Sequence, residues 1–164
     1  MDIDLNKLWN SNTPEEEFLN LFIKLSTHLL SNVQNIKSKN IKSCLLAILA
    51  MVAHKYNQSV NVSSALMEYL YKYEHVAVTV AELLQLMVSQ YKNNEVVGDF
   101  MREIGKMEPS SNKSDATGAK NISVFIVSAA ELMPTVVLPF VSLIIPHLAD
   151  DVNNLFTFFL ILVK

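Results

Sequence analysis

The segment from Leu138 to Asp151, LPFVSLIIPHLADD, constrains the fold of this chain more than any other. It is an apolar stretch of helical length that carries prolines and stops at a Leu-Ala-Asp-Asp turn. This pattern is typical of the first helix of a two-helix repeat, and a second helix should follow it. Because one helix pair cannot bury its apolar face alone, neighbouring pairs must stack on it. We therefore expect an extended array of stacked helix pairs.

The helix and its turn resemble the start of a HEAT repeat, but the chain then continues as VNNLFTFFLILVK. The run from Leu155 to Val163 carries no charge. A helix that is apolar on every side is tolerated only where it is buried or lies in a membrane, and this run is too short to span a bilayer. We therefore expect a HEAT-like helical region at 1–151. Residues 152–164 are expected to be an atypical apolar tail, produced by truncation or mis-splicing, that does not form the second helix and promotes aggregation.

Composition and periodicity favour an all-α protein. Hydrophobic residues make up 51% of the 164-residue chain and charged residues 18%, which excludes a disordered chain. Three glycines and five prolines are too few for an all-β domain or a glycine-rich nucleotide-binding fold. Seven apolar stripes at helical spacing predict antiparallel helix pairs. The stripes cover residues 18–29, 41–56, 62–73, 76–91, 96–104, 122–133 and 135–148.

Polar and helix-breaking residues within the long apolar region near the C-terminus argue against a membrane span. Ile122 to Leu148 is long enough to cross a bilayer, but one glutamate and three prolines interrupt it. They are Glu131, Pro134, Pro139 and Pro146. We therefore expect no membrane partner.

The residues that most often carry chemistry are scattered. His28, His54, His75 and His147 lie on different predicted helices or at their ends, and no two have metal-ligand spacing on one helix face. Cys44 lies within an apolar stripe, which favours a small core residue over a nucleophile. The chain has no Walker glycine loop, GxGxxG, GxSxG or HExxH motif. We therefore expect no catalytic residue, no cofactor and no metal.

Two groups of basic residues are the candidates for contact with DNA phosphates. They are Lys37, Lys39 and Lys42 around one predicted helix start, and Arg102, Lys106, Lys113 and Lys120 around the Ser-rich segment 108–118. The formal net charge is −3 and Arg102 is the single arginine, so any DNA binding should be weak and non-specific. An ordinary solvated surface is the alternative interpretation.

Four segments of this chain occur in the order and spacing of a known family. They are LNKLWNSNTPEEEFLNLF, YKYEHVAVTVAELLQL, VVGDFMREIGKM and TGAKNISVFIVSAAELMPTVVLPFVSLIIPHLADD, and together they cover nearly all of residues 5–151. The chain resembles the condensin complex subunit 1 family, the HEAT-repeat, non-SMC regulatory subunits of condensin I. The related condensin II subunit is the second choice. In the family, the acidic turn leads into an amphipathic helix, and the apolar segment after Asp151 departs from that pattern.

The resemblance implies a HEAT-like α-solenoid fragment and a non-catalytic scaffold role in mitotic chromosome condensation. It implies binding to the kleisin subunit, the SMC ATPase heads and chromatin, in the nucleus, on chromosomes and, for part of the cell cycle, in the cytoplasm. The alternative from another class is a self-contained small helical bundle that binds a lipid or small molecule. Such a bundle would close around a cavity with convergent polar groups, whereas an open apolar face on the last helices would favour the solenoid.

Overall fold

The computed structural model describes residues 16–32, 39–108, 116–149 and 151–163. Every regular element in these ranges is helical, and the expected all-α class is confirmed. The elements are α2 (Glu16–Ser31), α3 (Lys39–Lys55), α4 (Ser59–Lys72), α5 (Val76–Tyr91), α6 (Asn94–Lys106), α7 (Ala116–Leu132), α8 (Pro134–Val137), η3 (Leu138–Phe140), α9 (Val141–Ile144), η4 (Ile145–His147) and α10 (Val152–Leu162). None of the described helices has both the length and the hydropathy that a membrane span requires.

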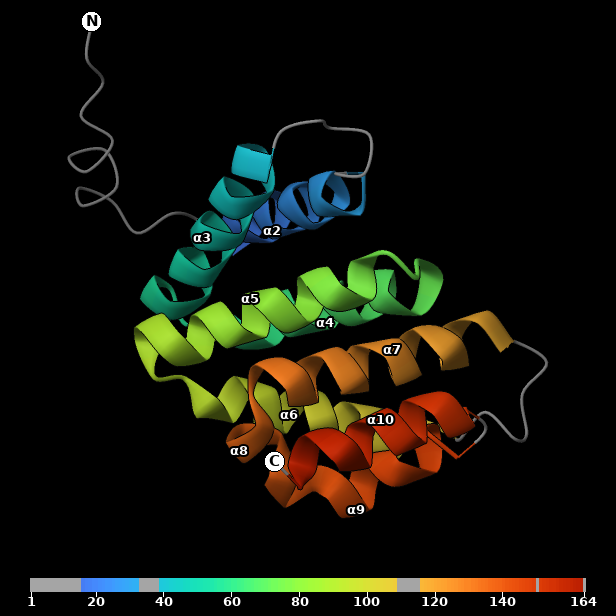
Figure 1. Ribbon diagram of the computed structural model, residues 1–164. Coiled ribbons are helices and arrows are strands. Elements are labelled where there is room, and N and C mark those ends of the chain that lie inside the picture. Colours follow the sequence, from blue (N-terminus) through green and yellow to red (C-terminus); the bar gives the residue numbers. More distant parts are fainter. Residues whose placement is uncertain (1–15, 33–38, 109–115, 150, 164) are drawn as a thin grey trace, which may run out of the picture.

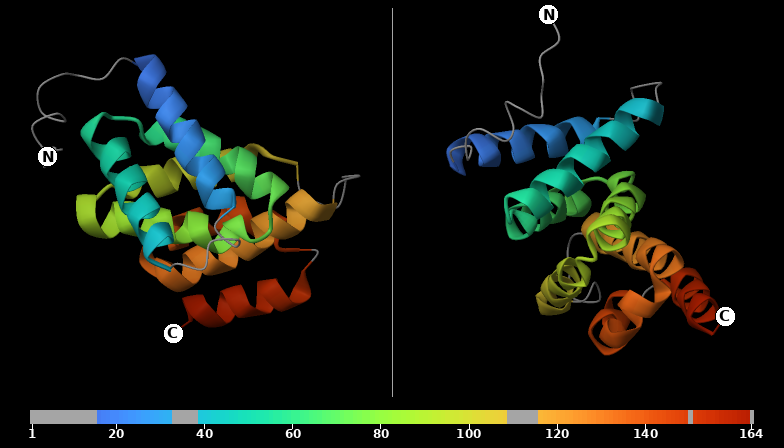
Figure 2. Two further views of the ribbon diagram at one scale, coloured as in Figure 1. Left: turned by 90° about the horizontal axis from the view of Figure 1, so that it is seen from above. Right: turned by 90° about the vertical axis from the view of Figure 1, so that its left-hand side faces the viewer.

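The helices lie in two layers of stacked pairs (Figure 1). Helices α2, α4, α6 and the α8–α9 segment follow one another in the first layer, each in contact with the next. Helices α3, α5, α7 and α10 do the same in the second layer. The right-hand view of Figure 2 shows how each pair stacks on the one before it. This is the predicted α-solenoid of antiparallel pairs.

The apolar segment after the turn is a helix, and its start is fixed by polar contacts. The Asp151 side chain is the N-cap of α10 and accepts a hydrogen bond from the backbone N–H of Asn154. The Asn154 side-chain amide donates to Ser123 Oγ of α7 at 2.9 Å. The prediction that residues 152–164 do not form the second helix is therefore wrong, because this cap and cross-helix contact hold α10 against α7.

One side of α10 is buried and the other is apolar and exposed. Phe158 is fully buried, whereas Phe156 and Leu160 are 66% and 50% exposed. The sequence-based view that a helix here would be apolar all round is thus correct, and the inner side finds a partner in α7.

The proline-rich first helix of the last pair is broken into short turns. Pro134 occupies the first turn of α8, and Pro139 and Pro146 occupy the first turns of the 3-10 segments η3 and η4. Proline lacks an N–H donor and clashes with the preceding turn, so it interrupts an α-helix. The prediction of one continuous helix over 135–148 is therefore wrong in detail. The segment is a series of short α and 3-10 turns that lies along α6.

Two burial predictions for the N-terminal pair are also wrong. Phe18, Leu21 and Leu25 of the predicted stripe are 54%, 66% and 56% exposed, and the opposite side of α2 is buried. That side includes Thr27, whose hydroxyl donates to the carbonyl of Ile23 at 2.8 Å and so is satisfied within its own helix. Cys44 is exposed rather than a core residue, because α3 buries the face that carries Leu46, Leu49, Ala50, Val52 and Ala53.

A buried amide connects the two layers between successive pairs. Asn121 of α7 is fully buried, and its side-chain NH₂ donates to the carbonyls of Leu70 and Tyr71 at 3.1 and 3.2 Å. These carbonyls belong to the last turn of α4, where a helix has no donors of its own. One turn earlier, Gly118 lets α7 approach closely, since a Cβ there would lie 2.4 Å from the Tyr71 ring. Both residues hold α7 against the end of α4.

Candidate interaction surface

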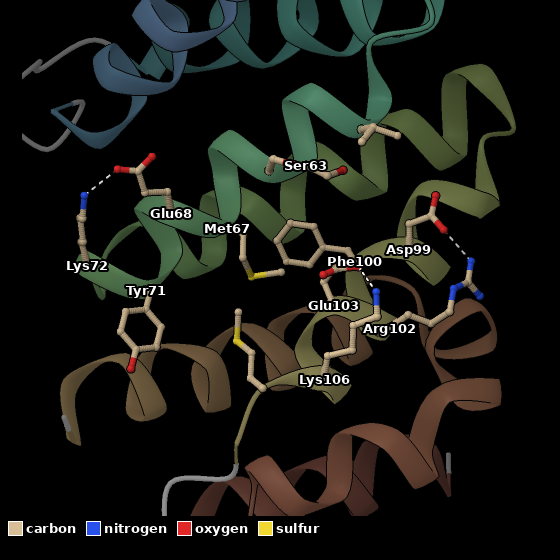
Figure 3. A pocket seen from close by; sticks show the side chains of 13 residues that line it. Ser63, Met67, Glu68, Tyr71, Lys72, Asp99, Phe100, Arg102, Glu103 and Lys106 are labelled. Carbon is tan, nitrogen blue, oxygen red and sulfur yellow. Dashed lines mark hydrogen bonds and ion pairs between the residues drawn. The ribbon is translucent and has the colours of Figure 1, made fainter. Parts of the chain in front are cut away.

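A groove of about 730 Å³ runs between α4 and α6, the second and third helices of the first layer (Figure 3). Its apolar part is formed by Met67 and Tyr71 from α4, Phe100 from α6, and Met107 just beyond α6. Phe100 is 1% exposed and packs on Phe125 of α7 with ring centroids 5.0 Å apart. The floor of the groove is therefore continuous with the core.

Three ion pairs border this groove. Lys72 Nζ lies 2.6 Å from Glu68 on α4, Arg102 lies 2.6 Å from Asp99, and Lys106 lies 2.5 Å from Glu103 on α6. Each pair has helical i,i+3 or i,i+4 spacing, which brings the two charges together on one helix face. The hydrogen bond and charge of Lys72 hold the pKa of Glu68 below its ordinary value, and Glu68 raises the pKa of Lys72 in return. The pairs are exposed, so they shape the rim without adding much stability.

A second, shallower groove of about 590 Å³ lies on the other side of α6, against α8 and η3. It shares Asp99 and Arg102 with the first groove. The Arg102 guanidinium lies 5.8 Å from the centre of the Phe140 ring, within the range of a cation–π contact. The outer face of α6 is thus a charged ridge between two grooves.

Four of the residues predicted to contact DNA phosphates lie beside carboxylates. Besides Arg102 and Lys106, Lys42 pairs with Glu82 at 2.5 Å and Lys120 pairs with Glu74 at 3.0 Å. Each of these acidic partners lowers the positive potential around its basic residue. DNA contact at these positions stays a proposal. There, the neighbouring carboxylate would compete with a DNA phosphate for each basic side chain.

The two predicted basic groups are only partly described. Lys39 opens α3, and Lys37 and Lys113 lie outside the described residues. Lys42 is in the second layer on α3, whereas Arg102 and Lys106 are on α6 in the first. Lys120 of the second group is on α7. DNA contact by either group therefore stays a prediction.

Three of the four histidines make contacts to side chains or backbone of other helices. His75 Nε2 donates to the carbonyl of Ser31 at the end of α2, and His54 stacks on Tyr91 with ring centroids 4.5 Å apart. His28 lies 3.4 Å from the Tyr69 hydroxyl. Among the described residues no three His, Cys, Asp or Glu side chains lie close enough to hold a metal ion.

The groove was not identified from the sequence, although a signal for it was present. Three oppositely charged pairs at i,i+3 or i,i+4 recur on the predicted helices at 62–73 and 96–104, at Glu68/Lys72, Asp99/Arg102 and Glu103/Lys106. Such pairs mark a helix face that stays in solvent. The pairing of these two faces across a groove depends on the stacking of α4 beside α6, which the periodicity alone does not give.

The apolar face at the end of the stack is open, as the solenoid interpretation requires. Phe156, Phe159 and Leu160 of α10 are 66%, 45% and 50% exposed, and Leu138 and Leu143 of the preceding segment are 54% and 41% exposed. The groove between α4 and α6 is a surface feature bordered by exposed charges. These features argue against a bundle that closes around a ligand cavity.

The fold defines the class of the protein: it is an α-solenoid built of stacked helix pairs. The family described as "non-SMC mitotic condensation complex subunit 1, N-term" matches residues 1–62. Condensin complex subunit 1 of Mus musculus is 27% identical over 153 residues, and that of Saccharomyces cerevisiae is 31% identical over 151 residues; each match covers 92% of this chain. The chain is therefore a relative of condensin complex subunit 1 over nearly all of its length.

The matches cover only a small share of the relatives. The chain spans 11% of the Mus musculus protein and 13% of the Saccharomyces cerevisiae protein. The properties of those whole proteins are therefore assigned to this chain only as proposals.

Proposed function

We propose that this chain contributes to the non-catalytic helical scaffold of a condensin complex that acts in chromosome condensation. The observation that carries this proposal is the match to condensin complex subunit 1 along 92% of the chain. The stack of helix pairs in the described part of the chain supports it. Stacked pairs form long surfaces that suit the binding of extended partner segments. Its place is then on chromosomes and in the nucleus, with a cytoplasmic pool for part of the cell cycle.

Within the complex, the proposed partners are the kleisin subunit and the SMC ATPase heads. ATP hydrolysis belongs to the SMC heads in this proposal, and the chain itself positions its partners. The experiment is size-exclusion chromatography of the purified chain mixed with a kleisin–SMC head subcomplex from condensin I or, in a parallel run, from condensin II.

Co-elution with the condensin I subcomplex, without ATPase activity of the chain alone, is the expected result. Preference for the condensin II subcomplex would instead favour the second choice of relative. Elution as a free species in both runs, or ATP hydrolysis by the chain alone, would contradict the proposal.

Binding of this chain alone to DNA is expected to be weak and strongly salt-dependent. The formal net charge is −3, and Lys42, Arg102, Lys106 and Lys120 each lie beside a carboxylate. A few phosphate contacts give non-specific dissociation constants of about 10⁻⁴–10⁻⁶ M at physiological salt, with little sequence preference. Fluorescence anisotropy with two duplexes of unrelated sequence, at rising salt, measures both properties. Sub-micromolar binding that survives moderate salt would show that a basic patch is stronger than this surface indicates.

A further inference from the structure

We propose that the N-terminal segment MDIDLNKLW, residues 1–9, folds back as an amphipathic helix over the exposed apolar side of α2 and covers the N-terminal end of the helix stack. The structure describes the chain from Glu16 onward, so this segment lies outside the described residues. The contact is independent of the proposed scaffold role, because it lies within one chain.

Helix α2 has two apolar sides, and one of them is uncovered. One side packs against α3, α4 and α5. The other carries a stripe at helical spacing, in which Phe22 is half-buried and the other members are exposed: Phe18, Leu21, Phe22, Leu25 and Leu29. Figure 2 shows α2, in blue, at one end of the stack, where no described helix lies over this stripe. A contiguous apolar surface of this kind marks a contact site.

The N-terminal segment has a matching apolar stripe. Four of its apolar residues recur at the spacing of one helix side: Met1, Leu5, Leu8 and Trp9. Ile3 and Lys7 fall on the opposite side of the same helix. The segment therefore has the pattern of a helix that covers one apolar surface and leaves its other side in solvent.

The connection between the segment and α2 favours an antiparallel pair. Residues 10–13, NSNT, are turn-forming types, and Pro14 is typical of the first turn of a helix. A connection of this length is within the range that joins two antiparallel helices in an αα-hairpin. The segment thus reaches the exposed side of α2 without any further chain.

In such a hairpin, residues at equal distances along the chain from Thr13 lie level with each other. Three pairs of apolar residues then meet across the contact: Leu8 with Phe18, Leu5 with Leu21, and Met1 with Leu25. The same register places Asp2 level with Lys24, which is exposed at the edge of the α2 stripe. Apolar spacing and charge therefore agree on one register.

The short connection also favours this segment over a second copy of the chain. A segment held by a short flexible linker has an effective concentration of about 1 mM at its site. A second copy would have to compete at the much lower concentration of the protein itself. The uncovered side of α2 is therefore assigned to the N-terminal segment.

Trp9 provides the test, because it is the single tryptophan of the chain. Its fluorescence is measured in the full chain and in a peptide of residues 1–13, which supplies the undocked reference. In the full chain, emission should lie at shorter wavelength, and the acrylamide quenching constant should be at least about twofold lower, as burial of the indole predicts. Equal quenching in the chain and the peptide would overturn the proposal.

Paired variants locate the contact on both sides. Leu21→Lys on α2 and Leu5→Lys in the segment should each raise the quenching constant toward the peptide value, because losing one buried leucine shifts docking by about tenfold or more. Ile3→Lys, on the opposite side of the segment, and Leu160→Lys, at a 50% exposed position on α10, should leave it unchanged. An effect of Ile3→Lys equal to that of Leu5→Lys would exclude this contact.

The remaining outcomes distinguish other arrangements. If Leu21→Lys lowers the thermal midpoint, Leu5→Lys carries the test, because it changes no described residue. Protection of Trp9 that survives Leu21→Lys in a folded chain would place the segment on another surface and overturn the proposal. Protection that is lost on dilution, with a monomer–dimer equilibrium in sedimentation, would overturn it in favour of a second copy.

Discussion

Replacing Phe158 with alanine is expected to lower the free energy of unfolding by about 3–5 kcal/mol, the range for truncating a buried phenylalanine. Phe158 is the residue of α10 that is fully buried, and α10 contacts α7 along the end of the stack. The loss should fall near the lower end of the range, since a terminal helix can shift to fill part of the cavity. Urea denaturation followed by circular dichroism measures it.

Neighbouring phenylalanines on the same helix provide matched controls. Phe156 is 66% exposed, so Phe156→Ala should change stability by less than about 0.5 kcal/mol. It should also raise the soluble yield, because it removes apolar surface from the open face. Equal losses of stability for Phe158→Ala and Phe156→Ala would mean that α10 is not docked on α7 with this face inward.

The isosteric change Asn121→Asp is expected to destabilise the fold by about 3–5 kcal/mol at neutral pH. The amide of Asn121 donates to two carbonyls at the C-terminal end of α4. A carboxylate has the same size but no donor, and its charge would face carbonyl dipoles in a fully buried site. The carboxyl would therefore be favoured in its protonated form when folded.

This prediction carries a definite pH dependence. A folded-state pKa above the unfolded value means that the penalty is absent below the unfolded pKa of about 3.9 and grows as pH rises toward the folded pKa. Unfolding free energies of the variant and the parent, compared between about pH 4 and pH 7, should diverge with increasing pH. Asn153→Asp, at an exposed position in the first turn of α10, is the control and should stay within about 0.5 kcal/mol at both pH values. A difference in unfolding free energy between Asn121→Asp and the parent that does not change with pH would contradict the role assigned to Asn121.

The central helices could be predicted closely from the sequence. The predicted stripe Val96, Val97, Phe100, Met101 and Ile104 is the buried face of α6. The β-branched start of α5, at Val76–Val80, is helical as predicted. In α6 a clear apolar stripe faces a polar side, so periodicity alone identifies the buried face. Helix α5 is instead buried on most of its sides between Val76 and Met87.

At the ends of the stack, the buried faces of the helices could not be predicted from the sequence. Helix α2 carries apolar residues on two sides, and the buried side includes Ser26 and Thr27, which periodicity does not count as core. Burial there depends on the position of α4, a tertiary contact. The docking of α10 depends in the same way on Ser123, which lies 31 residues before Asn154.

The interaction surface was the least predictable part. The basic residues could be found in the sequence, but their acidic neighbours Glu74 and Glu82 lie on other segments and meet Lys120 and Lys42 only in the folded chain. The groove likewise needs α4 and α6 side by side. Sequence spacing reports contacts within one helix, whereas these features are made between helices.

A cross-link between α7 and α10 tests most directly whether α10 continues the stack of helix pairs in the second layer. The variant carries Ser123→Cys and Asn154→Cys, with Cys44→Ser to remove the native thiol. The two replaced side chains are in contact, with Ser123 Oγ and Asn154 Nδ2 2.9 Å apart. Mild oxidation should join this pair by a disulfide within the monomer and raise the thermal midpoint. The pair Ser123→Cys and Asn153→Cys, which moves one thiol to an exposed position, should react far more slowly. Equal reaction of both pairs, or none of the first, would contradict the stacked arrangement.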